Sequence, residues 1–183
     1  EVSEIFSMSM ELFVFPWSEL FFKEEADKHR YFHLVDALVK IPKMCVVDEF
    51  QEEVYENPEL TPEERRKLWS KIEKKYMPYR DYGGISHLEE GGVWQEIPHI
   101  YEVPFYFLDY ALAQVVAIQL WGKSTVDWDQ AWDTYLRLCK IGGSMSFTEL
   151  LEEGQLSSPF EEQTFIELKS FVTTKIESMK MPV

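Results

Sequence analysis

Apolar residues fill most of the first 15 positions and leave only a narrow polar stripe. On a helix, Glu4, Ser7 and Glu11 fall on one face, because spacings of three, four and seven residues return to nearly the same side. The other faces are apolar, which predicts a buried helix. A buried ionised carboxylate must be paired, hydrogen-bonded, protonated or bound to a metal. The alternative is that both glutamates extend to the surface.

The helical pattern continues with two breaks at prolines. Pro16 is expected to kink or end the first helix, which continues at a new angle over residues 17–25. Residues 27–39 and 43–55 each carry apolar residues at helical spacing, and Pro42 is expected to break the chain between them.

A strong helix start follows the Asn-Pro pair that ends residues 43–55. Thr61 can cap the new helix, Pro62 suits its first position, and Glu64 completes a capping box. The apolar residues that follow at helical spacing predict its buried face: Leu68, Trp69, Ile72 and Tyr76.

Glycine and proline replace the helical pattern between Met77 and Pro104. We expect one long loop here, and long loops inside compact domains often carry function. The loop holds His87 and His99, two of the four histidines. For His87 we favour an ordinary structural role.

Residues 105–121 are almost uniformly apolar and predict a central helix that ends at Gly122. Tyr106 and Tyr110 share one face of it, and small side chains continue that face. Such a stripe can line a cleft. It can equally make a close helix–helix contact in which both hydroxyls bond to neighbours.

Three further helices are predicted in the remainder, and no strand is convincing anywhere. The helices cover residues 127–139, 147–153 and 160–180, separated by glycine and by serine and proline. The sequence therefore predicts an all-α fold.

Composition narrows the functional classes. The 183 residues suffice for one domain with a sizeable core, and 45% hydrophobic residues exclude disorder. A net charge of -15 argues against nucleic acid and anionic membranes as partners. We find no apolar run of membrane-spanning length and no secretory signal. Cys45 and Cys139 lie far apart in the sequence and show no metal-binding or disulfide spacing. This is typical of buried, reduced thiols. We therefore expect a cytoplasmic protein.

Several segments together resemble the oligoendopeptidase F branch of the thimet oligopeptidase-like zinc metallopeptidases. They follow the family's order and span essentially the whole chain, at residues 4–13, 47–51, 54–58, 99–111, 142–143 and 158–160. The resemblance implies the multi-helix C-terminal half of a zincin-type oligopeptidase catalytic domain over residues 1–183. The glycine- and proline-rich stretch would be its active-site loop.

The resemblance also implies a zinc site. In that family two histidines of an H-E-x-x-H helix and a glutamate on a following helix hold one zinc ion, and Glu4 matches that glutamate. Ser7 and Glu11 share its stripe and would orient the metal-bound histidines through hydrogen bonds. Three protein ligands leave an open position for water, which the metal activates.

The same resemblance implies which residues bind the substrate. The family uses a histidine before the tyrosine-bearing helix, and tyrosines on that helix, to bind substrate and stabilise the oxyanion. His99, Tyr106 and Tyr110 match these positions. A hydrogen bond donated to the developing oxyanion is stronger in the transition state than in the ground state, and it therefore speeds the reaction. The implied activity is hydrolysis of internal bonds in short peptides.

One departure from the family changes the expectation for this chain. No H-E-x-x-H occurs in the sequence, so two zinc ligands and the general-base glutamate are absent. Three explanations are open: a fragment, a second chain that supplies the missing half, or a non-catalytic relative. We favour a fragment whose partner is the upstream part of the same catalytic domain. The isolated chain is then expected to be inactive.

The rival hypothesis is a non-catalytic acidic helical domain that serves as an interaction module or scaffold. It explains the acidity and the helices. It does not explain glutamates in an apolar helix or a glycine-rich loop that places a histidine before a tyrosine-bearing helix.

Overall fold

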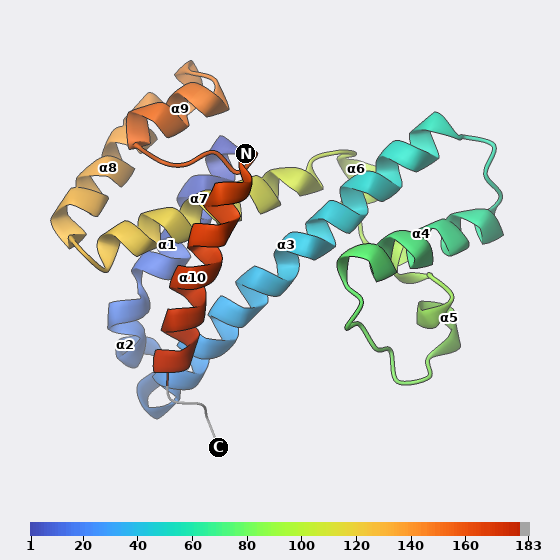
Figure 1. Ribbon diagram of the computed structural model, residues 1–183, viewed down its shortest axis with the longest axis horizontal. Coiled ribbons are helices and arrows are strands. Elements are labelled where there is room, and N and C mark those ends of the chain that lie inside the picture. The colour runs from blue at the N-terminus through green and yellow to red at the C-terminus, as the bar shows by residue number, and fades with distance from the viewer. Residues whose placement is uncertain (180–183) are drawn as a thin grey trace. The chain divides into compact units, whose positions relative to one another are not determined.

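The computed structural model describes residues 1–179, and within them the chain is built of helices and turns with no strand (Figure 1). The predicted all-α fold is confirmed. The chain divides into two compact units. Unit 1 comprises Glu1–Ala37 and the residues from Leu112 onward, and unit 2 comprises Leu38–Ala111.

Unit 1 contains most of the helices. They are α1 (Val2–Phe13), η1 (Phe15–Trp17), α2 (Ser18–Phe22), η2 (Lys23–Glu25), the first part of α3 (Ala26–Glu56), most of α7 (Phe107–Ser124), α8 (Trp128–Ile141), η4 (Gly142–Ser144), α9 (Phe147–Gly154) and α10 (Glu162–Ser178). Pro16 lies in η1, so the break predicted after the first helix is confirmed. Lys180, the predicted end of the last helix, lies outside the described residues.

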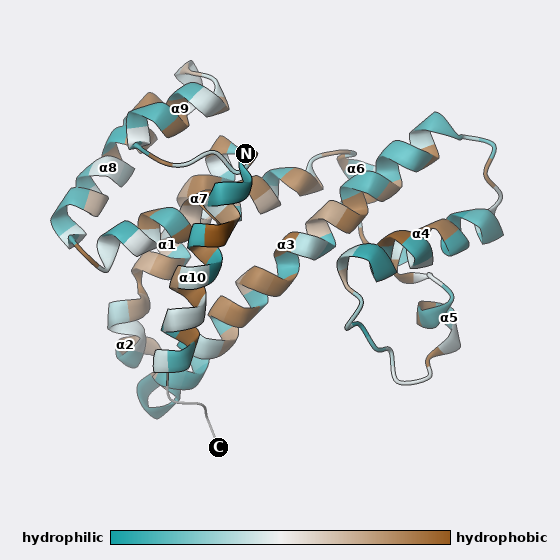
Figure 2. Ribbon diagram, in the orientation of Figure 1, coloured by the Kyte–Doolittle hydropathy of each residue, from teal (hydrophilic) through white to brown (hydrophobic). Residues whose placement is uncertain are grey.

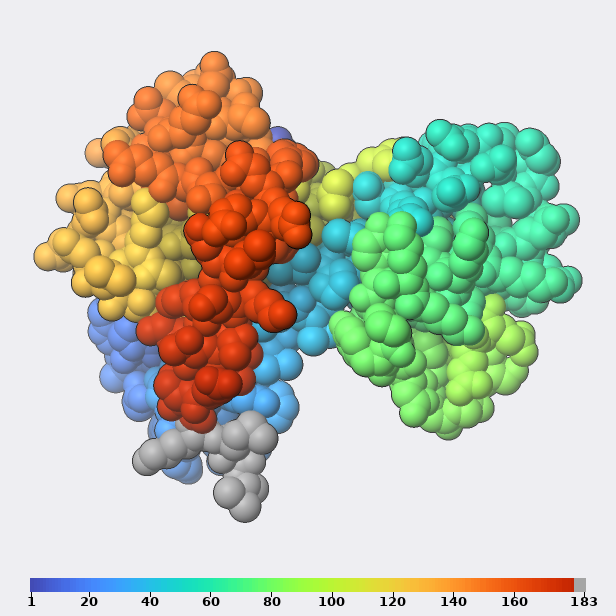
Figure 3. Space-filling view, viewed as in Figure 1, coloured from blue at the N-terminus to red at the C-terminus, as the bar shows by residue number. Residues whose placement is uncertain are grey.

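The core of unit 1 is formed where α1, α7, α8 and α9 meet. Phe13 packs its ring edgewise against Trp128 and Tyr135, with 5.5 Å between ring centroids in each case. Edge-to-face pairs of this kind add to the stabilisation that comes from burying the rings. By contrast, most residues of α10 are exposed, and its surface faces the viewer in Figure 3.

The expectation that α1 is buried on all sides is wrong. Its buried residues are Ile5, Ser9, Leu12 and Phe13, a single stripe at spacings of four, three and one. Glu4 is half-buried, whereas Ser7 and Glu11 are exposed. A helix whose one side packs on its neighbours leaves the opposite stripe outside. Glu11 therefore follows the alternative in which it extends to the surface, whereas Glu4 stays half-buried.

Two helix starts in unit 1 agree with the sequence prediction. The Asp127 side chain accepts a hydrogen bond of 3.0 Å from the backbone nitrogen of Gln130 at the start of α8. Ser146 and Glu149 form a reciprocal capping box at the start of α9. Such caps satisfy backbone N–H groups that the first turn of a helix leaves unpaired.

Unit 2 has its own core. Its elements are the rest of α3, α4 (Pro62–Tyr76), α5 (Ser86–Glu89), η3 (Val93–Glu96), α6 (His99–Glu102) and the first turn of α7. Phe50 of α3 packs edgewise on Trp69 of α4 with ring centroids 5.2 Å apart. Most residues of α4 are hydrophilic (Figure 2). The predicted capping box of Thr61 and Glu64 is confirmed.

α3 runs through Pro42 without a break, so the two helices predicted there are one. A proline inside a helix removes one backbone hydrogen bond and costs about 3 kcal/mol. Buried residues lie on both sides of it, at Leu34 and Ala37 before it and at Met44 and Val46 after it. Packing of these side chains outweighs the local penalty.

The predicted loop between Met77 and Pro104 contains three helical turns, α5, η3 and α6, and is pinned to α4. Gly91 has φ +92°, and a Cβ there would lie 2.0 Å from the carbonyl oxygen of Arg66. Only glycine allows so close an approach of two backbones. Gly122 does not end α7, which continues to Ser124.

The stretch Val2–Glu56 passes a test for membrane spans by length and hydropathy, contrary to our expectation from the sequence. Only 33% of its most apolar window is buried. In the structure this stretch is divided among α1, η1, α2, η2 and α3. Core helices of soluble proteins can have the same length and hydropathy.

Candidate active site

Unit 2 brings three predicted site residues together. The hydroxyl oxygen of Tyr110 lies 3.4 Å from Nε2 of His99. The ring of Tyr110 meets those of His99 and Tyr106 edgewise, with centroids 5.6 and 5.3 Å apart. All three side chains are half-buried.

His99 is held in place by the element that carries the tyrosines. It begins the short helix α6, and its ring lies 5.0 Å from that of Phe107 in the first turn of α7. Phe107 also contacts Tyr110, with ring centroids 5.7 Å apart. Phe107 packs against the core of unit 2 as well, which gives both polar side chains a rigid support.

The connection between α6 and α7 has an unusual backbone. Phe105 has φ +65°, in the left-handed region, where a bulky residue is rare. This conformation costs about 1–2 kcal/mol. The ring of Phe105 meets that of Tyr55, from the last turn of α3, at 5.0 Å. Nothing in the sequence pattern indicated this pair.

Ser7 acts on the predicted zinc ligand itself. Its hydroxyl donates to Oε2 of Glu4 at 3.1 Å and lies 3.0 Å from the Glu4 carbonyl oxygen. The serine therefore orients the carboxylate. Its expected contact with a metal-bound histidine stays a prediction.

Glu11 pairs with a histidine that the sequence analysis did not select. Its Oε2 lies 3.4 Å from Nε2 of His33 in α3. The ring of His29, one turn earlier, lies 5.6 Å from that of His33 and stacks on Phe22 at 3.7 Å. Burial, and then the charges of His33 and Arg30, lower the pKa of His29. The sequence could have indicated this pair, because His29 and His33 are four residues apart and so lie on the same face of a helix.

Glu4 fits the part of one zinc ligand. Its carboxylate is half-buried and is held by Ser7, and carboxylate oxygens are ordinary zinc ligands. Within residues 1–179 no three His, Cys, Asp or Glu side chains are grouped so that they could hold a metal ion. In this part of the chain Glu4 can thus be one member of a ligand set.

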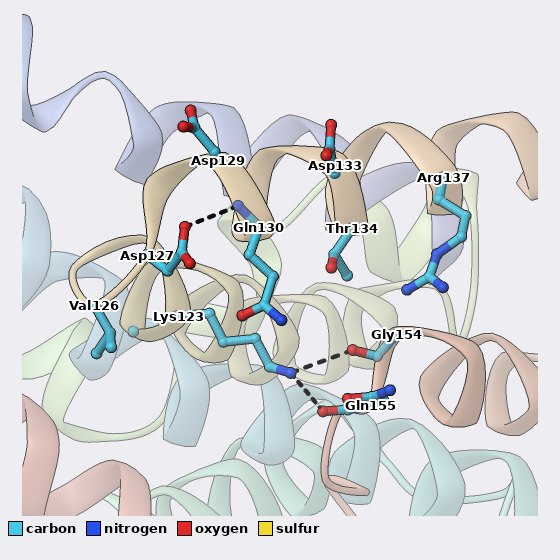
Figure 4. Close-up of a pocket in the computed structure, with 11 residues that line it drawn as sticks. Lys123, Val126, Asp127, Asp129, Gln130, Asp133, Thr134, Arg137, Gly154 and Gln155 are labelled. Atoms are coloured by element: carbon cyan, nitrogen blue, oxygen red, sulfur yellow. Dashed lines mark hydrogen bonds between the residues drawn. The ribbon is translucent and has the colours of Figure 1, made fainter.

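A broad depression of about 1020 Å³ in unit 1 lies between α8 and the ends of α7 and α9 (Figure 4). Lys123 crosses it and donates to the carbonyl oxygen of Gln155 at 2.8 Å, with that of Gly154 at 3.4 Å (Figure 4). Burial, and then the charge of Arg137, lower the pKa of Lys123. The Lys123 ammonium group is thus already hydrogen-bonded to carbonyl oxygens at the C-terminal end of α9. None of the predicted site residues lines this depression.

An acidic depression of about 410 Å³ lies along α3 in unit 2. Its acidic lining residues are Asp48, Glu49, Glu52, Glu53 and Glu56. Burial, followed by the charges of Glu52 and Asp109, raises the pKa of Asp48. Hydrogen bonds from Lys75 and Tyr76 lower the pKa of Glu49. This surface disfavours anionic ligands.

Comparisons with known proteins show the family to which the chain belongs. The sequence profile of peptidase family M3 matches residues 1–169. A solved structure assigned as an oligoendopeptidase F is similar at 49% identity, with a TM-score of 0.94 over 97% of this chain and 31% of the other. PZ peptidase A with an inhibitor is similar at 48% identity, with a TM-score of 0.93 over 97% and 32%.

A third structure, assigned as an oligoendopeptidase F from Bacillus anthracis, is 44% identical, with a TM-score of 0.76 over 97% of this chain and 28% of the other. No curated protein matches. The chain spans about a third of the length of these solved relatives. The chain belongs to peptidase family M3.

Proposed function

We propose that this chain is part of a zinc metallo-oligopeptidase that hydrolyses internal bonds of short peptides. Family membership supports a peptidase, and the similar solved structures are of an oligoendopeptidase F and of PZ peptidase A. The observation that carries the proposal is the pairing of Tyr110 with His99, two hydrogen-bonding side chains on a rigid apolar support.

Zinc, when bound, activates water and polarises the peptide carbonyl as a Lewis acid. Glu4 would supply one ligand. The two histidine ligands and the general base would come from an H-E-x-x-H segment upstream in the same catalytic domain. Ser7 fixes the Glu4 carboxylate, and this hydrogen bond limits the orientations in which its oxygens can be offered.

His99 and Tyr110 would bind the carbonyl of the substrate. The 3.4 Å between the Tyr110 hydroxyl and Nε2 of His99 is long for a hydrogen bond, so little is lost when either group turns to a substrate. An imidazole N–H and a phenolic O–H can both donate to an oxyanion as it forms. Tyr106, edgewise on Tyr110, would position that ring or add a donor.

The partners in this proposal are short peptides and the upstream part of the catalytic domain. We propose a cytoplasmic location, which is supported by the two cysteines, both free of disulfides and half-buried. The net charge of -15 supports the absence of nucleic acid from its partners.

A reconstitution experiment tests the function. The chain is expressed in continuity with an H-E-x-x-H segment taken from a solved relative, and cleavage of a quenched peptide is measured with and without a chelator. We expect turnover that the chelator abolishes and that zinc restores. A folded protein with zinc bound but no turnover would favour the acidic scaffold instead.

A further inference from the structure

We propose that Tyr55 and Phe105 form an apolar subsite that binds an apolar side chain of the peptide substrate next to His99 and Tyr110. This inference rests on the proposed peptidase function. It concerns specificity, a property that depends on how the site contacts the rest of the peptide.

The two rings come from distant parts of unit 2 and meet at its surface. Tyr55 lies in the last turn of α3, and Phe105 lies in the turn between α6 and α7. Their centroids are 5.0 Å apart at an interplanar angle of 63°. Tyr55 is 59% exposed and Phe105 is 43% exposed. Within this chain, two large rings thus contact each other and leave much of their area uncovered.

The backbone at Phe105 makes the exposure of its ring harder to explain by folding alone. A phenylalanine at φ +65° is strained, and burial of the ring does not compensate, since 43% of the residue remains exposed. Glycine would adopt this conformation without the penalty. A strained and exposed aromatic residue at this point is accounted for if the ring contacts substrate.

The position of the pair suits a substrate side chain. Phe105 directly precedes Tyr106 and lies five residues before Tyr110, whose hydroxyl is a proposed oxyanion donor. An extended peptide rises about 3.3 Å per residue, so a side chain near the cleaved bond can reach a neighbouring surface. Val103, between α6 and α7, is 45% exposed, and Tyr101 of α6 is 57% exposed.

Nearby charges define which side chains the subsite would reject. Glu56 follows Tyr55 directly in α3, Glu52 lies one turn earlier, and Glu102 lies at the end of α6. All three are exposed. An acidic substrate side chain would meet like charges there, whereas a leucine or phenylalanine side chain would not.

The test uses the reconstituted enzyme and three matched sets of peptides that carry Leu, Ser or Glu at each position in turn. The variants are Tyr55→Ser and Phe105→Gly, the second of which keeps the left-handed backbone while it removes the ring. Phe105→Leu keeps an apolar side chain. The control is Tyr79→Ser, because Tyr79 is also 59% exposed and lies outside the pair.

We expect wild-type enzyme to prefer Leu over Ser and Glu at one position. Tyr55→Ser and Phe105→Gly should lower kcat/KM for that Leu peptide about tenfold, mainly through KM, and should change the Ser peptide less than twofold. Phe105→Leu should retain most of the preference, and the control should retain all of it.

Two results would overturn the subsite. The first is an unchanged Leu preference in both variants. The second is an equal loss for the Leu, Ser and Glu peptides together with a lower Tm, which would mean that the rings pack against other protein. In either case the wild-type enzyme still cleaves peptides, whereas failure of the proposed function would abolish cleavage in the wild type as well.

Discussion

The hydroxyl of Tyr110 lies 3.4 Å from Nε2 of His99, although the two residues belong to different helices. If this hydroxyl donates to the oxyanion, Tyr110→Phe should lower kcat of the reconstituted enzyme by about 10²–10³ with little change in KM. The ring and its packing remain, so Tm should hardly move. Steady-state kinetics and thermal melts on one preparation measure both quantities.

Tyr106→Phe is the matched control for that substitution, since it removes the same atom from the neighbouring ring. We expect a smaller loss of kcat. Should Tyr110→Phe lower Tm and leave kcat at the wild-type value, the hydroxyl would serve packing only, at a cost of about 1 kcal/mol for the lost hydrogen bond.

Glu4→Gln should reduce zinc content and activity together. The amide has nearly the shape of the carboxylate but lacks the negative charge that binds the metal. Ser7→Ala removes only the hydrogen bond to Oε2 of Glu4 and should weaken zinc binding less. Metal analysis after dialysis, with peptide cleavage on the same samples, gives both values. Full zinc and full activity in Glu4→Gln would exclude Glu4 as a ligand.

The 183-residue chain alone should neither retain stoichiometric zinc nor cleave peptides. One carboxylate cannot replace three ligands, and a catalytic zinc needs three. Metal analysis and a quenched-peptide assay on the purified chain provide the measurement. Stoichiometric zinc with chelator-sensitive turnover would contradict this prediction and point to a different metal site.

Pro42→Ala should stabilise the chain. Pro42 lies inside α3, where a proline lacks the N–H that an alanine would provide to the helix. We expect a gain of about 1–3 kcal/mol, or roughly 2–10 °C in Tm for a chain of this size. Thermal denaturation followed by circular dichroism measures the shift. A lower Tm would show that packing of the Pro42 ring is worth more than the missing hydrogen bond.

Acidification should destabilise unit 1 through His29. Its folded pKa is lowered from the ordinary value of 6.5, chiefly by burial. The unfolded state therefore binds the proton more readily, and the stability that His29 supports above pH 6.5 is lost as the pH falls through the lowered pKa. His29→Phe keeps a ring to stack on Phe22 and removes the titration. Its Tm should vary less between pH 7 and pH 5.

The control for that experiment is His87→Gln, at an exposed histidine outside the cluster. This variant should keep the wild-type dependence of Tm on pH. If His29→Phe shows the wild-type dependence as well, other groups cause the loss of stability in acid.

Local signals in the sequence predicted the helix starts well. The sequence predicts Thr61 as a cap, and the helical pattern predicts the starts near residues 127 and 147. In the structure Thr61, Asp127 and Ser146 each cap a helix through atoms only three residues away, so the relevant chemistry is contained in a short window. The breaks failed for the opposite reason. Proline and glycine each destabilise a helix locally, and this cost can be read from the sequence. Pro42 and Gly122 nevertheless lie inside helices, because packing with distant residues, which the sequence does not show, outweighs that cost.

The candidate site shows the same division. His99, Tyr106 and Tyr110 could be grouped from the sequence because they lie within 12 residues and match a family pattern. The contacts of Glu11 with His33 and of Tyr55 with Phe105 join residues 22 and 50 positions apart, and only the fold brings them together. The surface position of Glu11 depended on which stripe of α1 is covered.

The close approach of Gly91 to Arg66 has a consequence for the candidate site. Because two backbones touch at the base of the loop, the anchor tolerates almost no side chain there, whatever the neighbouring sequence. Residues 78–90 before it are mostly exposed. α6, which carries His99, follows this fixed point eight residues later. A change at Gly91 would therefore be expected to disturb the position of His99 although it lies outside the candidate site.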